Sequence, residues 1–211
     1  TFELWGQKHV IDAGLLAAGD LDWMSNVDDN YPDSAGPLQA RTLLYQRAAS
    51  MPVESMLIGN IHAELPTIQE SFATEIGSAP LLLGDLRKLT ARDQQWYHDE
   101  IAWFKNLRRT SEISESFFPL GHWLQPSPAA WDGFARFAHS GSGVIAIFRN
   151  KSRVTTANVQ LPLMPDGNFK VHSVITNKDL GVFTKAAWER GVHVTIPASE
   201  PVEILEVTAA K

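Results

Sequence analysis

The stretch that decides the fold runs from residue 81 to residue 110, LLLGDLRKLTARDQQWYHDEIAWFKNLRRT. The run Leu81-Leu82-Leu83 at its start has the length of a short strand, which Gly84-Asp85 ends. Thr90 fits a helix N-cap, and Asp93 stands where it can return the bond. Apolar residues then recur at helical spacing over a broad stripe, which predicts a well-buried helix: Tyr97, Ile101, Phe104 and Leu107.

The same alternation of strand and helix runs through the preceding residues. Strands are expected at Leu4-Trp5, Leu21 to Ser25 and Met56 to Ile58, and helices at Ile11 to Ala18, from Pro37 and from Pro66. Short apolar strands that alternate with helices predict a parallel sheet, either open or closed into a barrel. Four such units are too few for an eight-stranded barrel of about 250 residues, so half a barrel or a small open sheet is expected.

After residue 110 the apolar period changes to two. Runs at this period predict strands over Val144 to Phe148, Phe169 to Ile175, Val192 to Ile196 and Val202 to Leu205. Asp166-Gly167-Asn168 between two apolar runs fits a hairpin turn. We therefore divide the chain into a β/α part, residues 1–110, and an antiparallel β-sandwich, residues 111–211.

Composition narrows the classes of function. The chain has 211 residues, a formal net charge of -6 and no cysteine. Nucleic-acid binding needs a positive surface, and no cluster of Lys and Arg supplies one. No stretch approaches the roughly 20 apolar residues of a membrane helix, so neither a nucleic acid nor a membrane is an expected partner. Without cysteine there is no disulfide framework and no thiolate chemistry.

The strongest candidate for chemistry follows the second expected strand. There Asn26, Asp28 and Asp29 place an amide and two carboxylates, and Trp23 offers an aromatic face of the kind that stacks on sugar rings. In β/α folds the carboxyl ends of the strands carry ligand-binding and catalytic residues. The competing interpretation is a polar loop in which Asp and Asn cap turns and the next helix.

Weaker candidates follow the other strands. Asn60 and His62 could hydrogen-bond sugar hydroxyls, although a lone loop histidine is more often structural, and Asp85 fits a cap of the helix that follows. Trp5 lies on the first strand with Glu3, and its direction cannot be read. The histidines lack metal-ligand spacing, so no metal and no cofactor are expected.

Three other tryptophans, at positions 123, 131 and 188, could form a carbohydrate platform. Packing in the core of the sandwich is the favoured explanation for them.

The order of these residues resembles a known family. Glu3, then Asp12-Ala13-Gly14-Leu15-Leu16, then Trp23 to Asp29 is similar to a segment of the α-galactosidases of glycoside hydrolase families 27 and 36. The interval from Asp12 to Trp23 matches family 36, and Ser25 to Asp29 is similar to the Ala-Asp-Ile-Asp-Asp of family 27. Gly84 to Arg108 looks like the last barrel helix with its entry, and Val144 to Asn150 looks like the start of the C-terminal sandwich.

The resemblance implies a fold and an activity. The fold would be the C-terminal half of a (β/α)8 TIM barrel followed by an antiparallel β-sandwich. The activity would be retaining hydrolysis of terminal α-galactosides by a nucleophile and an acid/base carboxyl group. The family nucleophile lies in a Lys-Trp-Asp-like motif on an earlier strand, and that motif is not in this chain. The missing N-terminal barrel half would then be supplied in cis or in trans, and a carbohydrate would be the substrate.

One departure from the family pattern concerns catalysis directly. The acid/base aspartate falls on Asn26, whose carboxamide cannot shuttle a proton as a carboxylic acid does. Asn26 could be an engineered change, Asp28 or Asp29 could have taken the role, or the protein could be a catalytically weakened relative.

The substrate and the type of module also stay open. The sugar could be another α-glycoside, such as an α-N-acetylgalactosaminide, contacted by Trp5, Trp23, Asn60 and His62. The alternative function is a non-catalytic carbohydrate-binding or structural β-sandwich module. Assembly into a homo-oligomer is left open.

Overall fold

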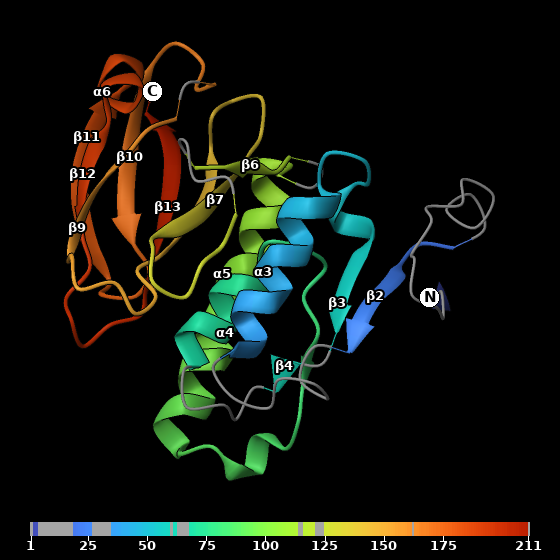
Figure 1. The fold of residues 1–211 in the computed structure, drawn as a ribbon. Coiled ribbons are helices and arrows are strands. Elements are labelled where there is room, and N and C mark those ends of the chain that lie inside the picture. The colour runs from blue at the N-terminus through green and yellow to red at the C-terminus, as the bar shows by residue number, and fades with distance from the viewer. Residues whose placement is uncertain are drawn as a thin grey trace. The chain divides into compact units, whose positions relative to one another are not determined.

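The computed structural model describes residues 2–3, 19–26, 35–59, 61–62, 68–113, 116–120, 125–161 and 163–210. Their backbone separates into two compact units, Thr1–Ile101 and Ala102–Lys211. Figure 1 shows the elements of each unit. The helix expected at Ile11 to Ala18 lies outside the described residues.

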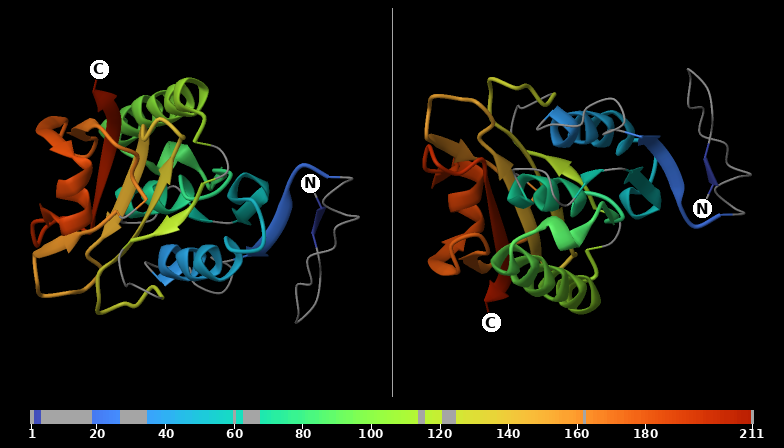
Figure 2. Two further views of the ribbon diagram at one scale, coloured as in Figure 1. Left: turned by 90° about the horizontal axis from the view of Figure 1, so that it is seen from above. Right: turned by 90° about the horizontal axis from the view of Figure 1, so that it is seen from below.

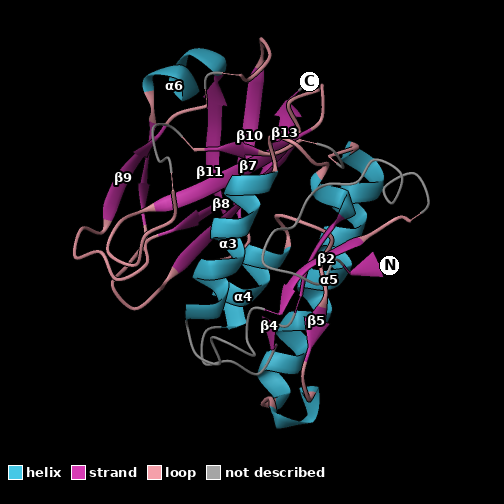
Figure 3. Cartoon of the chain, turned by 45° about the vertical axis from the view of Figure 1, so that its right-hand side comes forward, coloured by secondary structure: helices cyan, strands magenta, loops and turns pink. Residues whose placement is uncertain are grey.

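The first unit contains short parallel strands and helices (Figure 3). The strands β1 (Phe2–Glu3), β2 (Asp22–Asn26) and β3 (Met56–Gly59) pair in parallel in that order, and β4 (Ile61–His62) pairs in parallel with β5 (Leu82–Leu83). The helices are α3 (Ala35–Arg47), α4 (Ile68–Glu75) and the first part of α5 (Ala91–Ser111). Two 3-10 turns, η1 (Val53–Ser55) and η2 (Leu86–Lys88), complete the unit. The expected parallel pairing is therefore present, while a half barrel stays a prediction.

Helices α3 and α4 bury different kinds of face. Pro37 lies in the first turn of α3, as the sequence predicts, and its missing N–H leaves no hydrogen bond unmade there. The buried face of α3 includes Arg41 beside Leu44. In α4 the apolar residues Ile68 and Phe72 are buried, while the predicted start at Pro66 lies outside the described residues.

The long helix α5 starts at the predicted cap. The Thr90 hydroxyl oxygen accepts the Asp93 backbone N–H at 3.2 Å, and the same hydroxyl donates to the Asp93 carboxylate at 2.8 Å. Tyr97, Phe104 and Leu107 are buried. Most of the remaining α5 positions are exposed or half-buried, so the prediction of a well-buried helix is wrong. Its apolar stripe is a narrow seam on a largely solvated helix.

The second unit is built on antiparallel sheets, which confirms the predicted β-sandwich class. The larger sheet has six strands in the order β11-β10-β13-β8-β7-β6, and the smaller pairs β12 with β9. The strands are β6 (Phe118–Pro119), β7 (Asp132–Phe137), β8 (Gly143–Phe148), β9 (Thr156–Val159), β10 (Asn168–Ser173), β11 (Lys178–Thr184), β12 (Val192–Thr195) and β13 (Val202–Ala210). A single helix, α6 (Lys185–Arg190), interrupts the described strands of this unit.

One predicted turn is wrong. Asp166-Gly167-Asn168 does not close a hairpin, because the preceding strand β9 and the following strand β10 pair in different sheets. The hairpin lies instead between β10 and β11, where Asn177 has a φ of 51°. Strand β10 ends at Ser173, so Ile175 belongs to that turn rather than to the strand.

The main core of the second unit lies between the two sheets (Figure 2). Ile145, Ile147 and Leu205 from the larger sheet share a buried cluster with Val194 of β12 and Trp188 of α6. Trp188 is fully buried, and its ring centroid lies 5.7 Å from that of Phe183.

Trp131 belongs to the same cluster and donates its indole N–H to the carbonyl of Val154 at 3.0 Å. The packing role predicted for Trp131 and Trp188 is thus confirmed, while Trp123 lies outside the described residues. No described helix of either unit is long and apolar enough to cross a membrane.

The opposite face of the larger sheet also carries buried side chains. Phe134 is fully buried, with ring centroids 5.1 Å from Phe117 and 6.1 Å from Phe148. Trp103, from the last part of α5, donates its indole N–H to the Glu206 carboxylate of β13 at 2.7 Å. The end of α5 is therefore fixed to the middle of the sheet.

Replacing Trp188 by alanine should strongly destabilise the sandwich. The side chain fills the space between α6 and the sheets, and removing a buried Trp or Phe costs about 3–5 kcal/mol of unfolding free energy. The measurement is urea unfolding followed by circular dichroism. Val182→Ala on β11 is the control, because Val182 is 56% exposed and should change stability by no more than about 0.5 kcal/mol. Equal effects of the two changes would contradict this core.

Stability should also depend on pH through Glu203. Burial raises the pKa of the Glu203 carboxyl above the ordinary 4.5 of glutamate. Two hydrogen bonds that this carboxylate accepts, from the Ser173 hydroxyl at 2.8 Å and the Ile204 N–H at 2.9 Å, lower the pKa by less than burial raises it. A raised carboxyl pKa means that the native state binds the proton more tightly than the unfolded state. Proton binding by Glu203 therefore contributes fully to the free energy of unfolding below about pH 4.5. This contribution is lost as the pH rises through the folded-state pKa.

Glu203→Gln keeps an acceptor oxygen but cannot ionise. Between pH 4.5 and 8, the unfolding free energy of this variant should fall less than that of the parent, because the contribution of Glu203 ionisation is removed. The variant should be at least as stable as the parent at pH 8. Urea unfolding at several pH values measures both. Glu189→Gln, on a carboxylate with 46% of its side chain exposed, is the matched control. An unchanged pH profile in Glu203→Gln would refute the assignment.

Candidate functional site

The candidate site lies where the parallel strands of the first unit end. Asn26 is the last residue of β2 and pairs in register with Gly59, the last residue of β3. Glu3 at the end of β1 pairs with Trp23, three residues earlier in β2. The carboxyl ends of β2 and β3 therefore meet at one edge, the edge that carries ligands in parallel β/α folds.

The pairing of β2 with β3 is irregular just before Asn26. Trp23 pairs with Leu57 and Ser25 pairs with Ile58, so Met24 is an extra residue on β2. Such a bulge breaks the alternation of a strand and increases its twist, and bulges concentrate next to active sites. The bulge therefore lies two residues before Asn26, the candidate acid/base position.

His62 lies at the end of a strand in a second, two-stranded parallel sheet. It ends β4 and pairs with Leu83, which ends β5. His62 follows Gly59 by three positions, so their Cα atoms lie at most roughly 11 Å apart. The backbone thus keeps His62 within reach of the strand end that carries Asn26.

Asp85, directly after β5, has a structural role. Its carboxylate accepts the backbone N–H of Arg87 at 3.1 Å and forms two further bonds with the Arg87 guanidinium, at 2.7 and 3.0 Å. The hydrogen bond from the Arg87 side chain, and then that from its backbone, lowers the pKa of Asp85. Asp85 is the N-cap of η2, which agrees with the capping role predicted for it.

The other predicted site residues fall into two groups. Trp5, Asp28, Asp29 and Asn60 lie outside the described residues. For Trp23, Asn26 and His62 the structure defines the backbone position. Their roles as acid/base and sugar-contacting groups stay predictions.

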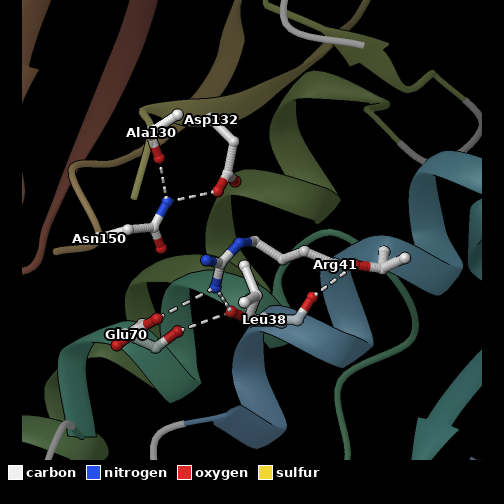
Figure 4. A network of polar contacts seen from close by, with 8 residues as sticks. Leu38, Arg41, Glu70, Ala130, Asp132 and Asn150 are labelled. Carbon is white, nitrogen blue, oxygen red and sulfur yellow. Dashed lines mark hydrogen bonds and ion pairs between the residues drawn. The ribbon is translucent and has the colours of Figure 1, made fainter. Parts of the chain in front are cut away.

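Sequence reasoning missed a buried ion pair between α3 and α4 (Figure 4). The Arg41 guanidinium lies 3.3 Å from the Glu70 carboxylate and donates to the Thr74 hydroxyl at 3.1 Å. The Arg41 side chain is fully buried, so the pair fixes the two helices against each other rather than facing solvent. No local signal could have found it, because Glu70 follows Arg41 by 29 residues.

A polar group around the buried Asp132 lies in the sandwich unit and was also missed. The Asn150 amide donates to the Asp132 carboxylate and to the Ala130 carbonyl, each at 2.7 Å (Figure 4). Asn150 has a left-handed φ of 54°, a conformation that asparagine tolerates better than most residues. The group holds the start of β7 against the turn that follows β8.

Comparison with known proteins gives structural relatives alone. No protein-family model and no curated protein sequence matches this chain. Among solved structures, it is similar to the family 36 α-galactosidase AgaB from Geobacillus stearothermophilus, with a TM-score of 0.68 and 16% identity over 93% of this chain and 27% of that one. It is also similar to the galactosidase domain of the α-galactosidase–sucrose kinase AgaSK, with a TM-score of 0.66 and 13% identity over 93% of this chain and 27% of that one.

A third relative comes from a fungus. α-Galactosidase I from Mortierella vinacea has a TM-score of 0.50 and 10% identity over 79% of this chain and 43% of that one. The resemblance to α-galactosidase-like glycoside hydrolases is therefore confirmed at the level of fold. This chain spans about a quarter to two-fifths of the length of these proteins.

Proposed function

We propose that this chain is part of a retaining α-glycosidase of the α-galactosidase type, with the acid/base position at Asn26. The observation that carries the proposal is the parallel register of Asn26 with Gly59 at the carboxyl edge of β2 and β3, in a fold shared with α-galactosidases. Residues 1–110 then form the C-terminal half of a (β/α)8 barrel. The bulge at Met24 and the short stretch of chain from Gly59 to His62 support this assignment.

The proposed chemistry needs two carboxyl groups about 5–5.5 Å apart. One carboxylate attacks the anomeric carbon while the other group gives its proton to the leaving oxygen. The second group then takes a proton from the water that releases the sugar. The nucleophile lies on an earlier barrel strand outside these 211 residues. The substrate is a terminal α-galactoside, contacted by Trp5, Trp23, Asn60 and His62.

Asn26 limits the rate in this scheme. A carboxamide is too weak an acid and too weak a base to transfer a proton near neutral pH, so it can donate a hydrogen bond to the leaving group but cannot protonate it. Asp28 and Asp29 follow Asn26 by two and three residues and are the carboxylates that could substitute for it. The scheme therefore predicts opposite effects for changes at these positions.

Asn26→Asp, made in the complete protein that contains this chain, should raise kcat/KM on an aryl α-galactoside about 10²–10⁴-fold, the usual contribution of positioned proton transfer. The assay is release of the aryl group at several pH values, where the new carboxyl should add an alkaline limb. Asn26→Ala is the control and should show no gain.

If Asp28 or Asp29 has taken the role, Asp28→Asn or Asp29→Asn should abolish activity and Asn26→Asp should add little. Turnover of no aryl α-glycoside by the parent and by Asn26→Asp alike would refute the enzymatic function.

The barrel proposal makes a separate prediction about assembly. A half barrel exposes apolar strand surface, which is unfavourable in water, so we expect the purified 23.4 kDa chain to associate with a polypeptide that supplies the missing strands. Light scattering with intact mass spectrometry measures this. A stable, soluble monomer of that mass would show that the fold closes on itself, and the half barrel would have to be abandoned.

A non-catalytic carbohydrate-binding or structural module is the second candidate. It is favoured by one observation, the absence from this sequence of both the Lys-Trp-Asp-like nucleophile motif and a carboxylate at position 26. Calorimetric titration with galactose and raffinose separates the two forms of this alternative. Saturable binding without turnover indicates a sugar-binding module, and no heat of binding indicates a structural one.

A further inference from the structure

The sandwich unit contains a pocket that the proposed glycosidase chemistry does not use. It encloses about 560 Å³ and lies between β6, the turn that joins β7 to β8, and the segment that leads from β9 to β10. Its volume falls in the roughly 300–1,000 Å³ range of small-molecule sites. All of its described lining residues belong to this one unit.

The lining is mainly apolar. Leu161 and Met164, which are 5% and 4% exposed, contribute buried aliphatic surface, and Phe118 and Phe137 contribute half-buried aromatic surface. Leu163 also lines the pocket and is 71% exposed, an unusual exposure for a large aliphatic side chain. Such a surface favours a flat apolar body over a sugar, whose many hydroxyl groups need a denser set of polar partners.

Two exposed polar side chains add hydrogen-bonding capacity to this lining. His139 has no hydrogen-bond partner among the described residues, so its ring N–H is available to an acceptor. Gln160 donates only a long bond of 3.4 Å to the Arg190 carbonyl. A few polar groups on a largely apolar pocket are the usual arrangement for fixing the orientation of a small ligand.

Hydrogen bonds hold two sides of the pocket in place. The Phe137 N–H donates to the Ser116 hydroxyl oxygen at 2.7 Å, which joins the strand end of β7 to the segment before β6. On the other side, the Leu161 N–H donates to the Trp188 carbonyl at 3.1 Å.

The turn between β7 and β8 is packed just as closely. A Cβ atom on Gly141, which has a φ of 81°, would lie 2.5 Å from the Phe169 ring and 2.8 Å from Pro165. The pocket is therefore preformed, which reduces the ordering cost of binding.

We propose that this pocket is a binding site for a small amphipathic molecule with a flat aryl or alkyl body and one hydrogen-bond-accepting head. The body lies against Phe118, Phe137 and Met164, and the head accepts from His139. The site is independent of the catalytic proposal, because none of its residues belongs to the first unit.

Two fluorescent probes of the same shape test the site in the complete protein that contains this chain. Anilinonaphthalene sulfonate carries an anionic acceptor head, and N-phenylnaphthylamine has the same body without it. We expect each to bind at one saturable site, with a dissociation constant on the order of 10⁻⁵ M for ligands of this size. Near-UV circular dichroism and a cooperative thermal transition confirm that the probes report on folded protein.

Three variants locate the binding. Ala138→Phe adds a ring to a residue that lines the pocket, and should weaken both probes at least 10-fold. Leu163→Asp changes an exposed lining residue and should weaken both without unfolding the chain. Val182→Asp, on an aliphatic residue that is 56% exposed and outside the pocket lining, should leave both affinities unchanged. If Ala138→Phe fails to fold, the Leu163 and Val182 pair decides.

His139→Ala tests the head group. It should weaken the sulfonate probe about 3–10-fold, the usual net contribution of one hydrogen bond, and leave the neutral probe unchanged. Equal weakening of the two probes would overturn the assignment of His139. Weak, non-saturating binding, or equal affinities in the Leu163 and Val182 variants, would overturn the site itself.

Discussion

The second unit depends on a strand that is buried on both of its faces. All six residues of β8 are buried, and β8 lies between β13 and β7 in the middle of the six-stranded sheet. Since side chains alternate between the faces of a sheet, both faces need a cover. On one face Ile145 and Ile147 pack with β9, β12 and Trp188. On the other, Phe148 packs on Phe134, and the end of α5 is attached through the bond from Trp103 to Glu206. This constraint explains why a long helix and a sandwich occur in one chain.

The sequence identified the elements whose local signals agree with their environment. The cap at Thr90 and the apolar run before Phe148 are strong local patterns, and both elements lie where they were predicted. Strand β11 gave no such signal, because every residue except Phe183 is exposed and Gly181 takes a φ of 112°. The turn at Gly167 was misjudged because turn residues specify a change of direction but not the sheet that the next strand joins. That choice depends on pairing over long distances in the chain.

The candidate site was predictable to a similar degree. Strand ends can be read from apolar runs, and the register of Asn26 with Gly59 places two of them together. The role of Asp85 could also be read, since a carboxylate after a strand and before a turn commonly caps it. The buried pair of Arg41 and Glu70 could not, because a charged residue in a helix ordinarily marks the solvated face. When a buried charged residue finds its partner only in the folded chain, the helical periodicity of the sequence assigns that residue to the solvated face.

The two sites argued from this structure differ in the physics that would produce binding. In the proposed function, the strand ends of the first unit would supply the amide of Asn26, the imidazole of His62 and the carboxylates of Asp28 and Asp29, which suit a ligand rich in hydroxyl groups. The pocket of the sandwich unit presents Met164 and two phenylalanines with His139 as a hydrogen-bond donor, so burial of apolar area would supply most of the binding free energy there. A sugar gains little from the second environment, because its hydroxyl groups find few polar partners there. The sugar proposed for the first unit and the apolar molecule proposed for the pocket are therefore separate ligands, and each has to be tested alone before its binding is assigned to a unit.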